Sequence, residues 1–210
     1  MTTRIKTIGR DEYIASIRLL QDSESCRFAN QALAWWDRHF SWRAQGCDVL
    51  VGPSDEPLSY IFSKIDHYSE YLTVYNLFTP LGEQRNGYAH ELLRLTMENA
   101  CKRHVRRITF SSVSASLDFY IGIGFIFWGI NTIGDYHCDL PIPKEGLSGM
   151  EKMTDNGDLK MLIGKQIEKI YAKVSNNEIK LTPTQLLRYQ KDRLKLGSKC
   201  RFEALSALKG

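Results

Sequence analysis

The segment "LTVYNLFTPLGEQRNGYAHELL" (residues 72–93) decides the fold of this chain. Its first part is rich in β-branched and aromatic residues, which predicts a strand over Tyr71–Thr79. A loop with two glycines follows, and an amphipathic pattern then predicts a helix that ends near Lys102. A strand that passes through a glycine-bearing loop into a helix is typical of anion-binding sites.

The loop has the chemistry that a phosphate group requires. Backbone N–H groups at the start of a helix lack intrahelical acceptors, and the helix dipole adds positive potential there. Gly87 lets the backbone approach a ligand closely, small Ala89 keeps bulk away, and Arg85 can add a charge-assisted contact. We therefore expect residues 84–89 to hold a pyrophosphate. The alternative is a loop that only connects a strand to a helix.

The rest of the first two thirds of the chain alternates strand and helix patterns. Strands are predicted at Arg4–Gly9, Cys47–Gly52, Leu58–Ile65, Arg106–Val113, Phe125–Ile130 and near Asp135–Leu140. Helices are predicted at Asp11–Leu20 with Asp11 as the cap, at Cys26–Trp42, and at Ser114–Gly122 with a terminating glycine. This order predicts an α/β domain over residues 1–140.

Residues 141–210 differ in composition and are predicted to form a basic, mainly helical C-terminal extension. They hold 14 basic and 8 acidic residues, whereas the preceding 140 residues hold 14 basic and 16 acidic residues. Amphipathic helices are predicted at Asp158–Ser175 and Thr182–Gly197. The extension could dock on the domain, join an oligomer such as a homodimer, or attract nucleic acid, although no nucleic-acid motif is present.

The bulk composition excludes several classes of protein. The chain has 210 residues, 43% hydrophobic and 25% charged, as in globular proteins. Its five cysteines and five histidines are scattered, which argues against a disulfide framework or a metal site and favours a reducing compartment. No apolar stretch approaches the length of a membrane span, and the N-terminus lacks a signal-peptide pattern. We expect a cytoplasmic protein without membrane or metal.

Two motifs together resemble the GNAT acyltransferase superfamily over about residues 3–140. Residues 84–89, "QRNGYA", match the acyl-CoA motif Gln/Arg-x-x-Gly-x-Gly/Ala, and Tyr120, Gly124 and Phe125 match the later motif Tyr-x-x-x-Gly-Phe. The resemblance implies the GNAT fold, an α/β fold whose mixed, mostly antiparallel central sheet is flanked by helices. It also implies acetyl-CoA or another acyl-CoA as co-substrate.

The resemblance implies roles for particular residues. Tyr120 would donate a proton to the departing thiolate as a general acid. A bulge in the strand near Asn76–Phe78 would free a backbone N–H for the thioester oxygen. The expected coenzyme contacts are Leu77, Phe78, Thr79, Gln84, Arg85, Asn86, Gly87, Tyr88, Ala89, Ser114 and Phe119.

The sequence departs from the family pattern at two positions. Thr73 replaces the glutamate that serves protein-lysine members as general base, so the base here would be Glu70, Asp66 or a chain of waters. Val113 replaces a frequent asparagine, whose coenzyme contact would be absent or pass to a neighbouring serine, Ser112 or Ser114.

The acceptor site would be lined by the first two helices and the turn after Ile130. The tryptophans at 35, 36 and 42 are expected in the core, with one of them facing the acceptor groove as the alternative.

The sequence therefore predicts an acyl-CoA-dependent N-acetyltransferase of the GNAT type. It would transfer an acetyl group to a primary amine of a small molecule or protein by direct transfer in a ternary complex. The alternatives are a catalytically weak GNAT-fold regulatory protein and a nucleic-acid-directed acyltransferase guided by the basic extension. The acceptor itself is not encoded in any motif.

Overall fold

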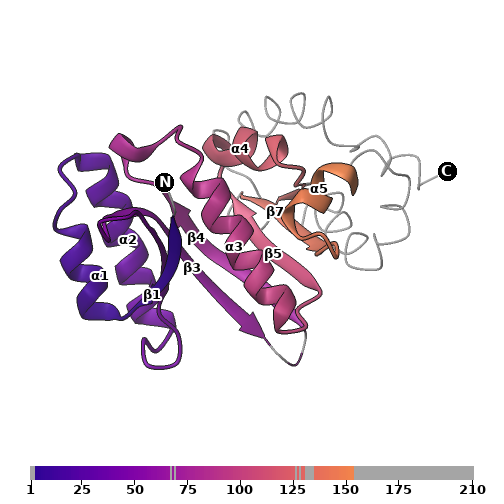
Figure 1. The fold of residues 1–210 in the computed structure, drawn as a ribbon, viewed down its shortest axis with the longest axis horizontal. Helices are drawn as coiled ribbons and strands as arrows, with labels where there is room; N and C mark the ends of the chain where they lie inside the picture. The colour runs from indigo at the N-terminus through magenta and orange to yellow at the C-terminus, as the bar shows by residue number, and fades with distance from the viewer. Residues whose placement is uncertain are drawn as a thin grey trace. The chain divides into compact units, whose positions relative to one another are not determined.

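The computed structural model describes residues 3–66, 68, 70–125, 127, 129–130 and 135–153. The chain divides into two compact units, Met1–Val105 and Arg106–Gly210, which are described separately (Figure 1). The two helices predicted between Asp158 and Gly197 lie outside the described residues, and the extension predicted from residue 141 stays a prediction.

The strands of the first unit pair in chain order. They are β1 (Arg4–Ile8), β2 (Cys47–Val51), β3 (Pro57–Asp66) and β4 (Tyr71–Phe78), and each is antiparallel to the next. These bounds agree with the predicted strands to within one residue at each end, because β-branched and aromatic side chains fill all four.

The helices of the first unit are α1 (Arg10–Ile17), α2 (Ser23–His39) and α3 (Tyr88–Lys102). The predicted Asp11 cap of α1 is wrong: the helix is capped by Gly9, whose N–H donates to Glu12 Oε2 at 3.3 Å. The start of α2 was predicted three residues late, because Asp22 begins the helix by accepting from the Ser25 N–H at 2.6 Å.

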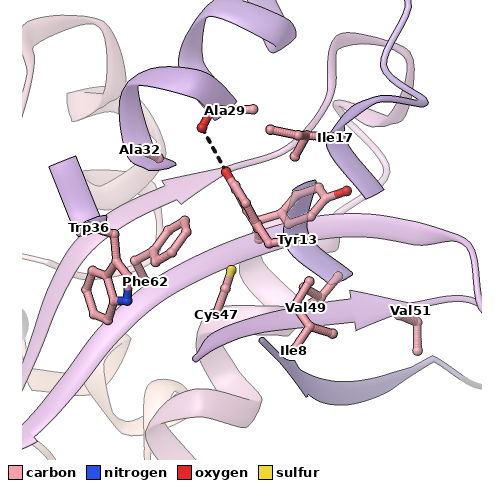
Figure 2. Close-up of a cluster of buried hydrophobic side chains, with 11 residues drawn as sticks. Ile8, Tyr13, Ile17, Ala29, Ala32, Trp36, Cys47, Val49, Val51 and Phe62 are labelled. Atoms are coloured by element: carbon pink, nitrogen blue, oxygen red, sulfur yellow. Dashed lines mark hydrogen bonds between the residues drawn. The ribbon is translucent and has the colours of Figure 1, made fainter. Parts of the chain in front are cut away.

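Helices α1 and α2 cover one face of this sheet with an aromatic core. Figure 2 shows Tyr13 of α1 reaching under α2, where its hydroxyl donates to the Ala29 carbonyl at 3.0 Å. Trp36 of α2 lies beside Phe62 of β3, with ring centroids 4.9 Å apart. Cys47 is also buried here, and burial raises the pKa of its thiol well above the usual value.

Helix α3 packs against β2, β3 and β4. Side chains alternate along a strand, so Leu50 and Ile61 point away from the α1–α2 face, and both are fully buried. The buried residues of α3 are Leu92, Leu93, Thr96, Met97 and Ala100. On its outer surface Arg94 binds Glu91 at 2.7 Å and Glu98 at 2.5 Å. The predicted amphipathic helix is thus confirmed.

Among the described residues of the second unit, three strands pair antiparallel, with β7 between its partners. Its strands are β5 (Arg107–Ser112), β6 (Gly129–Ile130) and β7 (Tyr136–Pro141). The pairing predicted between the segments at Ile130 and Asp135–Leu140 is confirmed. Arg107 and Asp139 form an ion pair across β5 and β7 at 2.8 Å.

The helical segments of the second unit are the 3-10 turn η2 (Ser114–Ser116), α4 (Leu117–Gly122) and α5 (Leu147–Met153). The sequence did not predict α5, because Gly146 and Gly149 weaken its helical pattern. Leu147 and Met150 are buried, so packing stabilises this helix rather than propensity.

Candidate functional site

Strand β4 contains a bulge close to the predicted position. Phe62 of β3 pairs with Asn76, but the next residue, Ser63, pairs with Val74. Tyr75 is therefore the extra residue, one position before the predicted range Asn76–Phe78. The uninterrupted ladder that the sequence could not exclude is ruled out.

The strand beyond the bulge is held firmly. The Phe78 ring stacks on Tyr60 with centroids 4.7 Å apart, so its side chain is already used in packing. The Ser59 hydroxyl donates to the Phe78 carbonyl at 3.1 Å and lies 2.9 Å from the Thr79 hydroxyl. Any ligand contact from this part of β4 would therefore come from the backbone, as the sequence analysis expects.

The loop after β4 is tied down at three points. The Leu81 N–H donates to the Ser25 hydroxyl of α2 at 2.9 Å. Within the loop, Gln84 donates from its amide to the Thr79 carbonyl at 3.2 Å, and Asn86 donates to the Glu83 carbonyl at 3.3 Å. The side chains of Gln84 and Asn86 thus stabilise the loop, and the Gln84 N–H is also used within it, since it donates to the Leu81 carbonyl at 3.3 Å.

The end of the loop has the conformation of an anion-binding turn. Arg85 and Gly87 both adopt a left-handed backbone, with φ of 66° and 82°. Left-handed residues in such turns let successive N–H groups point to one concave side. Gly87 is the N-cap of α3, and the N–H groups of residues 88–90 occupy the first turn, where an α-helix offers them no acceptor.

The space at Gly87 is open. A Cβ placed there would meet no atom within 4 Å. Arg85 and Gly87 are exposed, whereas Tyr88 and Ala89 are half-buried. The predicted loop residues 84–89 are therefore brought together on one exposed turn, with its backbone accessible and a guanidinium beside it.

The second unit holds Tyr120, Phe119 and Ser114. Tyr120 of α4 is buried, and its ring lies 4.6 Å from Phe110 and 5.0 Å from Phe119. Burial raises the pKa of Tyr120, and the Cys138 thiol adds to the effect, so the phenol stays protonated at neutral pH. A neutral phenol is the state that a proton donor requires.

Helix α4 ends at Gly122, as predicted, and Gly124 adopts the left-handed turn that follows it. Gly124 has φ of 93°, and the chain then turns back so that the Phe125 N–H donates to the Tyr120 carbonyl at 3.0 Å. The motif Tyr-x-x-x-Gly-Phe thereby has a structural reason, because its first and last residues are hydrogen-bonded to each other.

The position of the missing asparagine is also informative. Val113 is exposed just after β5, and the buried Ser112 uses its hydroxyl to donate to the Val113 carbonyl at 3.0 Å. Ser114 is half-buried at the start of η2. Of the two serines that could replace the asparagine, Ser112 already uses its hydroxyl in this bond to Val113.

Glu70 lies away from the bulge. It is exposed in the turn before β4, with a left-handed φ of 57°. Five residues of extended strand separate it from Tyr75, which corresponds to roughly 16 Å. Thr73, at the position of the family's glutamate, is half-buried and pairs with Lys64 across the ladder. A proton would have to travel from the bulge to Glu70 through water.

The sequence analysis missed the residues that support the loop, Ser25 and Ser59. Both are buried serines whose hydroxyls bind the backbone or side chain of residues 78–81. Serine at the start of a helix or within a strand is common, so no signal in the sequence distinguishes them. Only the pairing of α2 and β3 with the loop assigns them this role.

Metal-binding clusters and membrane-spanning helices are both absent from the described residues. Within the described part of the chain, no group of three or more His, Cys, Asp or Glu residues is arranged to hold a metal ion. Among the same residues, no helix combines the length and apolar character needed to cross a bilayer.

Comparison with solved structures identifies the fold. Tetrahymena GCN5 superposes with a TM-score of 0.54 at 13% identity, over 68% of this chain and 97% of its own. The PaiA N-acetyltransferase from Thermoplasma acidophilum, solved with coenzyme A, gives 0.51 at 13% identity over 66% of this chain and 98% of its own. A variant of the SpeG spermidine N-acetyltransferase from Vibrio cholerae gives 0.50 at 10% identity over 66% and 93%.

The chain therefore has the GNAT fold, and the predicted resemblance is confirmed at the level of the fold. Searches by sequence give no such link, because no family model matches the chain and no curated protein is significantly similar to it.

Proposed function

We propose that the protein is an acyl-CoA-dependent N-acyltransferase that moves an acetyl group to a primary amine of a small molecule or protein. The observation that carries this proposal is the sequence of features along one segment: a bulge in β4, a loop anchored by Ser25 and Ser59, and an open glycine at the start of α3. Structural neighbours with coenzyme A in their crystals support the same donor.

The residues of the loop suit the pyrophosphate of coenzyme A. The N–H groups at the start of α3 and the helix dipole both favour negative charge, and the open space at Gly87 admits phosphate oxygens to the backbone. Arg85 adds a bidentate donor on the exposed side. The coenzyme supplies an activated acyl group as a thioester; the chain supplies its position.

The backbone of β4 would bind the remainder of the coenzyme and polarise the thioester. The peptide groups of Leu77, Phe78 and Thr79 are proposed to pair with the pantetheine arm as an added strand would. An N–H group at the bulge is proposed to hold the carbonyl oxygen as it becomes negative. Donors of this kind contribute about 3–4 kcal/mol to acyl transfer.

Acyl transfer needs one group that gives a proton to the thiolate and another that takes a proton from the amine. Tyr120 would hold a proton for the thiolate, a role supported by the protonated state that its burial enforces. The amine must lose a proton before it attacks, and a chain of waters leading to Asp66 or Glu70 suits the distance better than direct contact. Ser114 and Phe119 are proposed as further coenzyme contacts.

Binding and transfer are tested in two steps. Acetyl-CoA should raise the melting temperature of the wild-type protein, and Gly87→Glu should abolish the rise because a carboxylate then occupies the phosphate position. A screen of amines, peptides and nucleic acids for thiol release from acetyl-CoA should then identify the acceptor. A protein that shows no thermal shift with any acyl-CoA and releases no thiol would refute the proposal, and a shift without release would favour a regulatory role.

A further inference from the structure

The surface beside the β4 bulge is aromatic and open. Trp35 of α2 and Tyr75 of β4 lie with ring centroids 5.0 Å apart and remain 38% and 37% exposed. Phe40 joins them, 5.0 Å from Tyr75 and 5.6 Å from Trp35, and the His39 ring stacks on Trp35 at 4.5 Å. We call these four residues the aromatic surface.

The aromatic surface is continuous with the proposed site of transfer. Tyr75 is itself the extra residue of the bulge, and Asn76 follows it directly. The Oδ1 atom of Asn76 is buried and has no hydrogen-bond partner among the described residues. Since buried polar atoms in native proteins nearly always have partners, this amide marks a place where a ligand or water completes the structure.

One ring of the aromatic surface already has an ammonium group over its face. The ammonium of Lys64 already lies over the Phe40 ring, 5.5 Å from its centroid, as an amine does in a cation–π contact. The pKa of Tyr75 is raised, mainly by burial and further by the charge of the Asp66 carboxylate, while a hydrogen bond with Thr73 opposes the rise. The ring faces of the aromatic surface therefore suit a bound ammonium group, and the Asp66 carboxylate is near enough to act on Tyr75 electrostatically.

We propose that the aromatic surface binds the acceptor, and that the acceptor is a primary amine attached to an aromatic ring. The proposal rests on the function proposed above and names its substrate class. A flat ring can pack on Trp35 and Tyr75 together, which an aliphatic chain does less well. The amino group then lies at the bulge, beside Asn76, where the acyl group would be delivered.

The test compares two amines that differ mainly in their ring. Phenethylamine and cyclohexylethylamine have the same chain length and similar apolar size, but only the first has a π system. With acetyl-CoA, kcat/KM for phenethylamine should exceed that for cyclohexylethylamine by on the order of tenfold, since each aromatic pair adds about 0.5–1.5 kcal/mol.

The variants test where this preference arises. Trp35→Leu should abolish the preference, Trp35→Phe should retain most of it, and the KM for acetyl-CoA should be unchanged in both. Phe28→Leu is the matched control, because Phe28 lies on the same helix and is also 38% exposed. That variant should keep the wild-type preference.

The outcomes separate this proposal from the general function. Equal kcat/KM for both amines, or an equal effect of Trp35→Leu and Phe28→Leu, would overturn the proposal of an aromatic acceptor. If thiol is still released in these experiments, the proposed transferase function stands. If no amine releases thiol, calorimetric binding of phenethylamine to the protein with coenzyme A present decides the matter. Binding that Trp35→Leu weakens supports the surface as a ligand site; binding that is absent or insensitive to Trp35 overturns it.

Discussion

Gly87 offers the sharpest test of how the loop works, because its replacement by alanine adds a methyl group without a clash. The residue has φ of 82° and ψ of 1°, and a Cβ would meet nothing within 4 Å. The effect on folding therefore comes from the backbone alone. A left-handed conformation costs a non-glycine residue about 1–2 kcal/mol. We expect Gly87→Ala to lower the melting temperature of the ligand-free protein by roughly 2–8 °C.

Gly82 provides the matched control within the same loop. A Cβ at Gly82 also meets no atom within 4 Å, and its backbone is not left-handed. Gly82→Ala should therefore leave stability unchanged or raise it by a few tenths of a kcal/mol through the lower entropy of the unfolded chain. Thermal unfolding followed by circular dichroism measures both variants under the same conditions.

Acetyl-CoA binding then tests the proposed ligand of this loop. The added methyl group of Gly87→Ala stands where the backbone would approach a phosphate, and the loss of one charge-assisted hydrogen bond is worth about 1.5–3 kcal/mol. Calorimetry should show affinity reduced by about 10- to 100-fold in Gly87→Ala and unchanged in Gly82→Ala. Equal stability of the two variants would refute the backbone argument, and equal affinity would refute the phosphate assignment.

Four further predictions concern the supports of the site and the core. Tyr120→Phe should reduce kcat about 10- to 100-fold with little change in acetyl-CoA affinity, because only the proton donor is removed. Thiol release measures kcat and calorimetry measures the affinity. Parallel loss of kcat and of affinity would mean that the tyrosine is structural. Ser25→Ala should destabilise the protein by about 1 kcal/mol and weaken acetyl-CoA binding, since Leu81 loses its acceptor and the loop its anchor; unchanged binding would show that the anchor does not shape the loop. Hydrogen bonds from Ser25 hold the pKa of Asp22 below its usual 3.8, so the contribution of the Asp22 carboxylate to stability is present above about pH 4 and is lost as pH falls through the lowered pKa. Asp22→Asn keeps a cap but does not titrate, so it should flatten the acid side of a plot of melting temperature against pH. An unaltered plot would contradict this role of Asp22. Tyr60→Phe should stabilise the protein by up to about 1 kcal/mol in urea unfolding, because the buried Tyr60 hydroxyl has no well-formed hydrogen bond among the described residues, although the Ser16 hydroxyl lies near it. A destabilised variant would reveal a bound water or a bond to Ser16.

The fold was predictable where local pattern and long-range packing agree. The strand ending at Phe78, the loop and α3 carry their own signals in composition, glycine placement and helical spacing. Prediction failed where packing overrides propensity, as in α5, which forms despite the glycine at position 149 because Leu147 and Met150 are buried. It also failed at helix ends, since the caps Gly9 and Asp22 lie outside the hydrophobic pattern that defines each helix.

Some features of the candidate site follow from local sequence, and others appear only in the tertiary structure. By itself the sequence predicted the glycine-bearing loop between β4 and α3, because such a turn is made from consecutive residues and needs only a glycine and a following helix. Tertiary structure alone decided that Tyr75 is the extra residue of the bulge, since a register shift is a relation between two strands. It also decided that Ser25 anchors Leu81 and that Trp35 and Tyr75 share one open surface, because these residues meet only when α2 packs on the sheet.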